Sequence, residues 1–244
     1  MNRSRHQTTR PTFRGLLLSV LGTALLLAWT TTASAITVGQ LDTFQDATTQ
    51  NWVEGLGGAI PPVPPAVVAN AGPNGTGDFA LRITATGAVI GPGSKLVVNN
   101  IQPRWLGDYT AAGVNGIVLD VRNPNAFELN LRVGIDGPAI GPTGGRWVSG
   151  AVVVPASSGW RTVIFSLLPA DLLPGDLGAT SASTTRANVA VLRVMHAPVA
   201  TWSTVAVAGQ MDLNDIEALP EPTLTISLLV GSLFARSLGS CRRR

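Results

Sequence analysis

Apolar and polar residues alternate repeatedly along the middle of this chain, and this pattern leaves little choice of fold. In residues 127–135, FELNLRVGI, every odd position is apolar and every even position is polar or glycine. That is the pattern of a strand with one buried face. Residues 79–83 and 117–121 repeat it, and only 169–177 suggest a helical turn. The sequence therefore predicts an all-β fold.

Further segments have the composition of strands and are separated by turns rich in Gly, Pro and Asn. These segments are 95–101, 147–154, 160–167, 189–195 and 210–216. Short strands at regular spacing are typical of an antiparallel sandwich. We therefore expect one antiparallel β-sandwich domain over residues 36–219, a length that suffices for a single core.

The amino end has the three parts of a signal peptide. Four arginines come first, an uncharged Leu-rich stretch spans 16–29, and Ala33 and Ala35 have the small-x-small spacing of a signal-peptidase site. We expect residues 1–35 to be removed by signal peptidase, with Ile36 as the first mature residue. A non-cleaved membrane anchor is the alternative.

The carboxyl end combines a Pro220-Glu221-Pro222 motif, an uncharged run over 223–235 and a terminal cluster of three arginines. Together they resemble the PEP-CTERM sorting signal, so residues 220–244 are expected to be read by an exosortase-type membrane protease. A helix over 223–241 would be about 28 Å long, close to the hydrocarbon thickness of a bilayer. Arg236 departs from the family pattern, because an arginine at the centre of a span costs about 3 kcal/mol on insertion scales. It lies near the basic end, however, so its side chain can reach the headgroups and the signal is expected to work. A buried C-terminal strand or helix is the alternative.

Charge and cysteine content exclude two classes of function for the domain. Between residues 36 and 219 there are nine basic and 13 acidic residues, which gives a net charge of −4. A chain of this charge without a Lys/Arg cluster has no footprint for nucleic acid. The only cysteine, Cys241, lies in the tail, so the domain has no disulfide and no thiol nucleophile.

The domain as a whole resembles exported jelly-roll modules of the galactose-binding-like and carbohydrate-binding type. The residues that carry the resemblance are DTFQD at 42–46 with Trp52, GDFALRI at 77–83, GIVLDV at 116–121, GWRTV at 159–163 and MDLNDI at 211–216. The resemblance implies a jelly roll, and also a structural calcium ion where the first and last strands meet a loop. The candidate ligands by position are Asp42, Asp46, Asp78, Asp212 and Asp215, because Ca²⁺ prefers oxygen ligands. Asp212 and Asp215 have opposite parity on a strand, so both could serve only with a bulge or from a loop. Solvated turn aspartates are the alternative.

Sugar binding commonly uses an exposed aromatic ring flanked by polar groups. Trp105, Tyr109 and Trp147 lie among loop residues with Arg and Asp neighbours and are the candidate glycan contacts, with burial in the core as the alternative. Trp52 and Trp160 are interpreted as core residues.

Catalysis finds little support in the sequence. His196 is the only histidine outside the leader, and its place at the end of an apolar strand suggests a locally satisfied structural residue. No Gly-x-Ser-x-Gly elbow, zinc motif or phosphate loop occurs.

The sequence thus predicts a non-catalytic protein of a bacterium with a Gram-negative type of envelope. We expect it to be anchored briefly in the inner membrane by its C-terminal helix and then processed to a cell-surface or extracellular matrix component that binds exopolysaccharide. A secreted glycan hydrolase and a purely structural matrix protein without a ligand are the alternatives.

Overall fold

The computed structural model describes residues 35–56, 60–61, 63–87, 91–137, 145–175 and 180–220. All of them belong to one compact unit. Ala33, Glu221, Pro222 and the apolar run after them lie outside the described residues. No helix among the described residues is long and apolar enough to cross a membrane.

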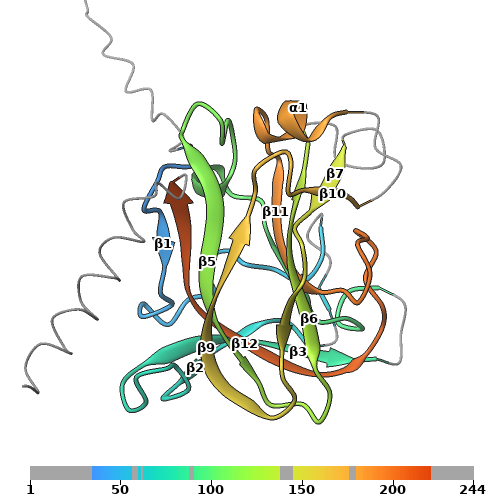
Figure 1. Ribbon diagram of the computed structural model, residues 1–244. Helices are drawn as coiled ribbons and strands as arrows, with labels where there is room; N and C mark the ends of the chain where they lie inside the picture. Colours follow the sequence, from blue (N-terminus) through green and yellow to red (C-terminus); the bar gives the residue numbers. More distant parts are fainter. Residues whose placement is uncertain are drawn as a thin grey trace, which may run out of the picture. The chain divides into compact units, whose positions relative to one another are not determined.

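The described residues form two six-stranded sheets, here called sheet A and sheet B (Figure 1). Sheet A consists of β1 (Leu41–Asp42), β2 (Ala66–Ala69), β3 (Phe79–Thr86), β5 (Val114–Asn123), β9 (Ser158–Ser166) and β12 (Ala208–Pro220). Sheet B consists of β4 (Val97–Asn100), β6 (Leu129–Asp136), β7 (Arg146–Val148), β8 (Val152–Val154), β10 (Leu173–Pro174) and β11 (Val191–His196). Two short helices, η1 (Pro103–Trp105) and α1 (Ala182–Arg186), lie in the connections.

The strand order is that of a jelly roll. Sheet A runs β2-β3-β12-β5-β9 with β1 beside β12, and sheet B runs β10-β7-β6-β11-β4 with β8 beside β6. Every pairing is antiparallel. The chain passes from sheet A to sheet B between β3 and β4, returns for β5, and ends with β12 between β3 and β5. This double Greek-key exchange defines a jelly roll, and the predicted fold class is confirmed.

The alternation seen in the sequence builds the main core between the sheets. Ile117, Leu119 and Val121 of β5 face inward, as do Leu129, Leu131, Val133 and Ile135 of β6, and all seven side chains are fully buried. Each such side chain stabilises the fold by about 1.5–3 kcal/mol relative to an exposed position. The sequence pattern therefore selected the inward face of each strand correctly.

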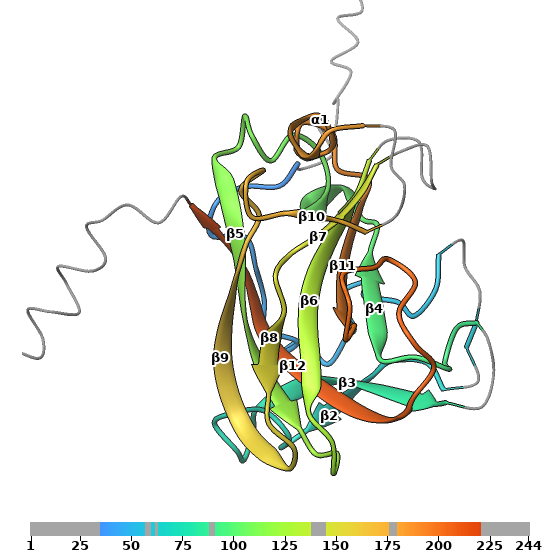
Figure 2. The same ribbon diagram turned by 45° about the vertical axis from the view of Figure 1, so that its right-hand side comes forward.

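Sheet B is also covered on its outer face, which the sequence did not indicate. Val191 and Met195 have the opposite parity to the core residues of β11, and they join Val148, Ala197 and Trp202 in a second apolar cluster. Trp202 belongs to the connection between β11 and β12, which passes the β4 and β11 side of the sheet (Figure 2). This covering connection shapes the candidate site described below.

Two expected elements differ from the structure. Residues 147–154 do not form one strand, because the chain leaves the sheet at Ser149, whose hydroxyl accepts the Val133 N–H, and returns as β8. The described part of 169–177 contains a turn and β10 instead of a helical turn. The helix α1 lies further along the chain and begins after Ser181, whose hydroxyl accepts the Thr184 N–H. A five-residue helix is too short to leave a helical period in the sequence.

Candidate functional site

Trp105 and Tyr109 are core residues, so their prediction as glycan contacts was wrong. Both are fully buried. The indole N–H groups of Trp105 and Trp52 donate to Oδ2 of Asp42, at 2.8 and 2.7 Å, and the Tyr109 hydroxyl donates to the Trp105 carbonyl. Neither ring can offer a face to a sugar. The alternative of burial applies to both, and the interpretation of Trp52 as a core residue is confirmed.

The remaining two tryptophans of the prediction are half-buried. Trp147 packs against the main core, and its indole N–H donates to the Thr180 carbonyl at 3.2 Å. Its role as a glycan contact stays a prediction. Trp160 is not a core residue, because it lies three positions before the inward-facing Val163 and so points out of sheet A. There its indole N–H donates to the Ala71 carbonyl, and the guanidinium of Arg122 lies 5.5 Å from the ring centroid.

Two of the predicted calcium ligands are committed to other partners. Asp42 accepts both indole N–H groups and pairs with Arg104. Burial raises the pKa of Asp42, although the two indoles and Arg104 act to lower it. Asp212 is fully buried between Arg82 and Arg122, at 2.8 and 2.5 Å. Neither carboxylate is placed to join a shared metal site.

Asp78 and Asp215 do come together, in a hollow that Thr43 and Gln45 also line. Asp215 lies at a bulge of β12 with a φ of 44°, as the parity argument required. Its pKa is raised, first by burial and then by the negative charges of Asp120, Asp78 and Glu217. Although burial acts in the opposite direction, hydrogen bonds from Asn74 and Gln45 keep the pKa of Asp78 below its usual value.

The five aspartates therefore do not fit the expected calcium site as a set. Asp46 is exposed and accepts the backbone N–H of Thr48 in its own turn. Nowhere in the described part of the chain do three or more His, Cys, Asp or Glu side chains gather as metal ligands. The calcium prediction is reduced to the Asp78 and Asp215 pair, with amide and backbone oxygens as the further ligands that Ca²⁺ would need.

His196 has the structural role expected of it. It ends β11, is 5% exposed, and its Nδ1 accepts the backbone N–H of Asn130 at 3.0 Å. Burial lowers its pKa. The Nδ1 atom of the ring is thus a hydrogen-bond acceptor within sheet B.

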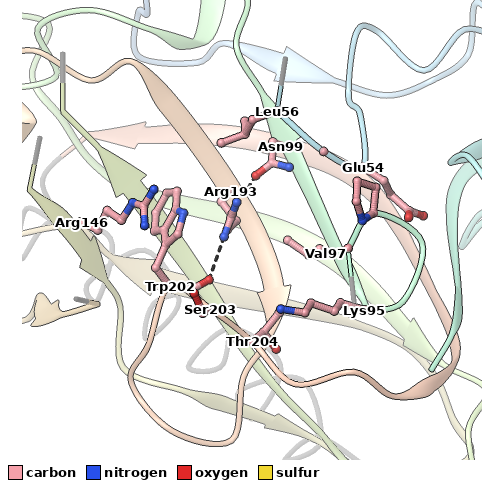
Figure 3. A pocket seen from close by; sticks show the side chains of 13 residues that line it. Glu54, Leu56, Lys95, Val97, Asn99, Arg146, Arg193, Trp202, Ser203 and Thr204 are labelled. Carbon is pink, nitrogen blue, oxygen red and sulfur yellow. Dashed lines mark hydrogen bonds between the residues drawn. The ribbon is translucent and has the colours of Figure 1, made fainter. Parts of the chain in front are cut away.

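A further candidate site is a hollow of about 300 Å³ on the outer face of sheet B (Figure 3). Its floor comes from β4 and β11, with Val97, Asn99 and Arg193 on the outward positions. Trp202 and Thr204 close one side, and the segment from Glu54 to Leu56 closes another. We call this the sheet B hollow.

Arg193 lies in the middle of the sheet B hollow and is held in a fixed orientation. Its Nε donates to Oδ1 of Asn99 and its Nη1 to the Trp202 carbonyl, both at 2.7 Å. The guanidinium also lies 4.0 Å from the centroid of the Trp202 ring. Figure 3 shows this ring between Arg193 and Arg146, whose guanidinium lies 5.4 Å from the same ring. Such cation–π contacts stabilise both partners.

Arg146 is anchored from behind by an ion pair. Its Nε lies 3.2 Å from Oδ2 of the fully buried Asp136 on β6. Trp202 is 3% exposed, so it acts as a wall of the hollow rather than as an open platform. The two guanidinium groups and the indole ring are therefore positioned before any ligand binds.

Glu54 is the unusual member of the lining. It is 1% exposed, and neither carboxyl oxygen has a hydrogen-bond partner among the described residues. Burial raises the pKa of Glu54 to about 7. Lys95 also lies on the lining, and Figure 3 shows its side chain extending toward Thr204.

The sequence analysis missed all the principal residues of this hollow. Trp202 lies in a turn segment, ATWST, without charged neighbours, so it had none of the features used to choose Trp105 and Trp147. One signal was available. Arg193 interrupts the apolar strand VLRVM at a position whose parity places it outside the core.

Neither protein-family models nor curated proteins match this chain. Among solved structures, a family 11 carbohydrate-binding module from Clostridium thermocellum is similar with a TM-score of 0.48 and 16% identity, over 75% of this chain and 97% of that one. A xylan-binding domain from Paenibacillus barcinonensis gives 0.42 and 11%, over 74% and 98%. An exo-β-agarase gives 0.49 and 10%, over 74% of this chain and 24% of that one.

Proposed function

We propose that the jelly roll is a non-catalytic glycan-binding domain and that the sheet B hollow is its binding site. The observation that carries this proposal is the fixed group formed by Arg193, Asn99 and Trp202 at the centre of the hollow. A site of about 300 Å³ is at the lower end of the range for small-ligand pockets. Its size suits a short stretch of a polysaccharide chain.

The chemistry of the lining matches that of a sugar. Sugar rings have apolar faces and a rim of hydroxyl groups, so they need apolar surface beside hydrogen-bonding groups. Leu56, Val97 and Trp202 supply the apolar surface, and Asn99, Ser203 and Thr204 supply polar groups. Because internal contacts already hold Arg193 and Trp202, binding would cost little side-chain ordering.

We further propose that the protein is exported and processed at both ends. Residues at both ends of the described domain support this proposal. Ile36, the expected first mature residue, is 2% exposed and donates its N–H to the Leu106 carbonyl, so it is an integral part of the folded domain. At the other end, β12 finishes at Pro220, the first residue of the expected sorting motif. Signal peptidase, an exosortase-type protease and transient contact with the inner membrane are the partners this implies, and the cell surface or matrix is the destination.

Titration of the purified protein with a panel of polysaccharides, followed by isothermal calorimetry, tests the binding proposal. We expect Asn99→Ala and Thr204→Val to weaken binding of whichever glycan binds the parent. Arg161→Gln, an exposed position on sheet A, is the matched control. Binding that survives both hollow variants would place the site elsewhere, and release of reducing ends would favour the hydrolase alternative. An absence of binding across the panel would favour a purely structural protein.

A further inference from the structure

We infer that the sheet B hollow prefers acidic glycans, whose carboxylate groups pair with the ammonium group of Lys95. This inference rests on the proposed glycan-binding function and names the class of sugar that the same site would take. It follows from which of the charged groups in the lining are already engaged.

Two of the three cations in the lining are held by neighbours. Arg146 is paired with Asp136, and Arg193 donates to Asn99 and to the Trp202 carbonyl. Lys95 is different, because its ammonium group has no ion pair and no hydrogen bond within the part of the chain that the structure describes. It is half-buried on the lining, and in Figure 3 its side chain reaches toward Thr204. Lys95 is therefore the cation that a ligand can engage.

The only carboxyl group on the described lining does not cancel this charge by direct contact. Glu54 is buried and makes no ion pair with Lys95. Its pKa of about 7 also leaves it partly protonated near neutral pH. The hollow thus presents an available cation in a domain whose net charge is −4.

This arrangement favours specificity over non-specific attraction. A polymer with many negative charges is repelled by the domain as a whole and attracted locally at the ammonium group of Lys95. A carboxylate seated at Lys95 would leave the rest of its sugar ring beside Trp202 and Asn99. Neutral glycans would keep the contacts with Trp202 and Asn99 and would lack the ion pair with Lys95.

The test uses the full chain in a non-ionic detergent and two forms of one polymer. Polygalacturonate carries carboxylates, and its fully methyl-esterified form has the same backbone without charge. We expect the acid form to bind about ten-fold more tightly. We also expect Lys95→Gln to remove this preference and Lys95→Glu to reverse it, while Arg161→Gln keeps it. Raising NaCl from about 0.1 M to about 1 M, which shortens the Debye length from about 10 to about 3 Å, should reduce the difference.

The outcomes separate the two proposals. Equal binding of both polymers, unaffected by Lys95→Gln, would overturn the acidic preference and leave glycan binding in place. Failure of both polymers to bind, together with failure of every glycan in the wider panel, would overturn the proposed function itself. Tighter binding of dextran sulfate than of polygalacturonate would overturn the assignment to carboxylates.

Discussion

Each sheet has a contact between arginine and tryptophan on its outer face, but the two contacts have different structural consequences. On sheet A, Arg122 lies over Trp160, which is part of strand β9 and half-buried. On sheet B, Arg146 and Arg193 flank Trp202, which comes from a connection and is 3% exposed. A tryptophan on a strand lies on its own sheet, whereas a tryptophan in a connection also places the backbone of that connection over the sheet. On sheet A the ring therefore lies on the strands and donates to the Ala71 carbonyl of the connection between β2 and β3, whereas on sheet B the connection that carries the ring also forms a wall of the hollow.

The largest expected effect comes from removing the aromatic ring on each face. Trp202→Ala should lower the free energy of unfolding by about 3–5 kcal/mol, because it empties a buried site at the second apolar cluster. Trp160→Ala should cost about 1–2 kcal/mol, the loss of one hydrogen bond and one cation–π contact. Urea denaturation measures both. Equal losses would show that the two faces are not different in the way proposed here.

The free energy of unfolding should depend on pH through Glu54, the buried carboxyl group of the sheet B hollow. Glu54 has a pKa of about 7 in the folded protein against 4.5 for the ordinary side chain. Its ionisation therefore destabilises the native state increasingly from about pH 4.5 to pH 7, by about 3 kcal/mol in all, and no further above that.

Glu54→Gln tests this cost. The variant should be more stable than the parent at pH 8, by up to about 3 kcal/mol, and close to it at pH 4.5. Thermal melting of both proteins across this range measures the difference, in which the titration of His196 and Asp215 cancels. A constant gap between the two curves would contradict the assignment of the pKa to Glu54.

On sheet A the cross-strand ion pairs should contribute less than the aromatic wall of sheet B. Asp212→Asn removes a buried charge that receives Arg82 and Arg122. Removing one partner of a fully buried pair costs about 3–5 kcal/mol, but the two arginines are 27% and 31% exposed. We therefore expect Asp212→Asn to lower the free energy of unfolding by about 2 kcal/mol. Glu128→Gln, at an exposed position, is the control in the same denaturation experiment. A loss no larger than that of the control would mean that Arg82 and Arg122 are fully solvated without Asp212.

The smallest effect concerns calcium at the edge of sheet A. If the Asp78 and Asp215 pair binds Ca²⁺, the ion at about ten times its Kd should stabilise the protein by about 1.4 kcal/mol. Asp215→Asn should abolish this gain, and Asp46→Asn should keep it. A rise in melting temperature that persists in Asp215→Asn would place the ion elsewhere.

Strand positions were predictable because each strand has to hide one face. The odd positions from 129 to 135 became the inward face of β6. The side chains of the candidate site were not predictable in the same way. Trp105 and Trp202 both lie outside the strands in short polar segments, and which one is buried in the main core depends on Asp42, a partner 63 residues away from Trp105. Local pattern carries no information on such long-range pairing.

The end of β12 at Pro220 bears on how the domain would behave under load. β12 lies inside sheet A, bonded to β3 and β1 on one edge and to β5 on the other. A pull on its carboxyl end acts along the strand, so many backbone hydrogen bonds resist in shear at the same moment instead of opening one after another. A domain tethered through this strand in moving fluid would hold its shape, and the tether would transmit the drag to whatever holds it.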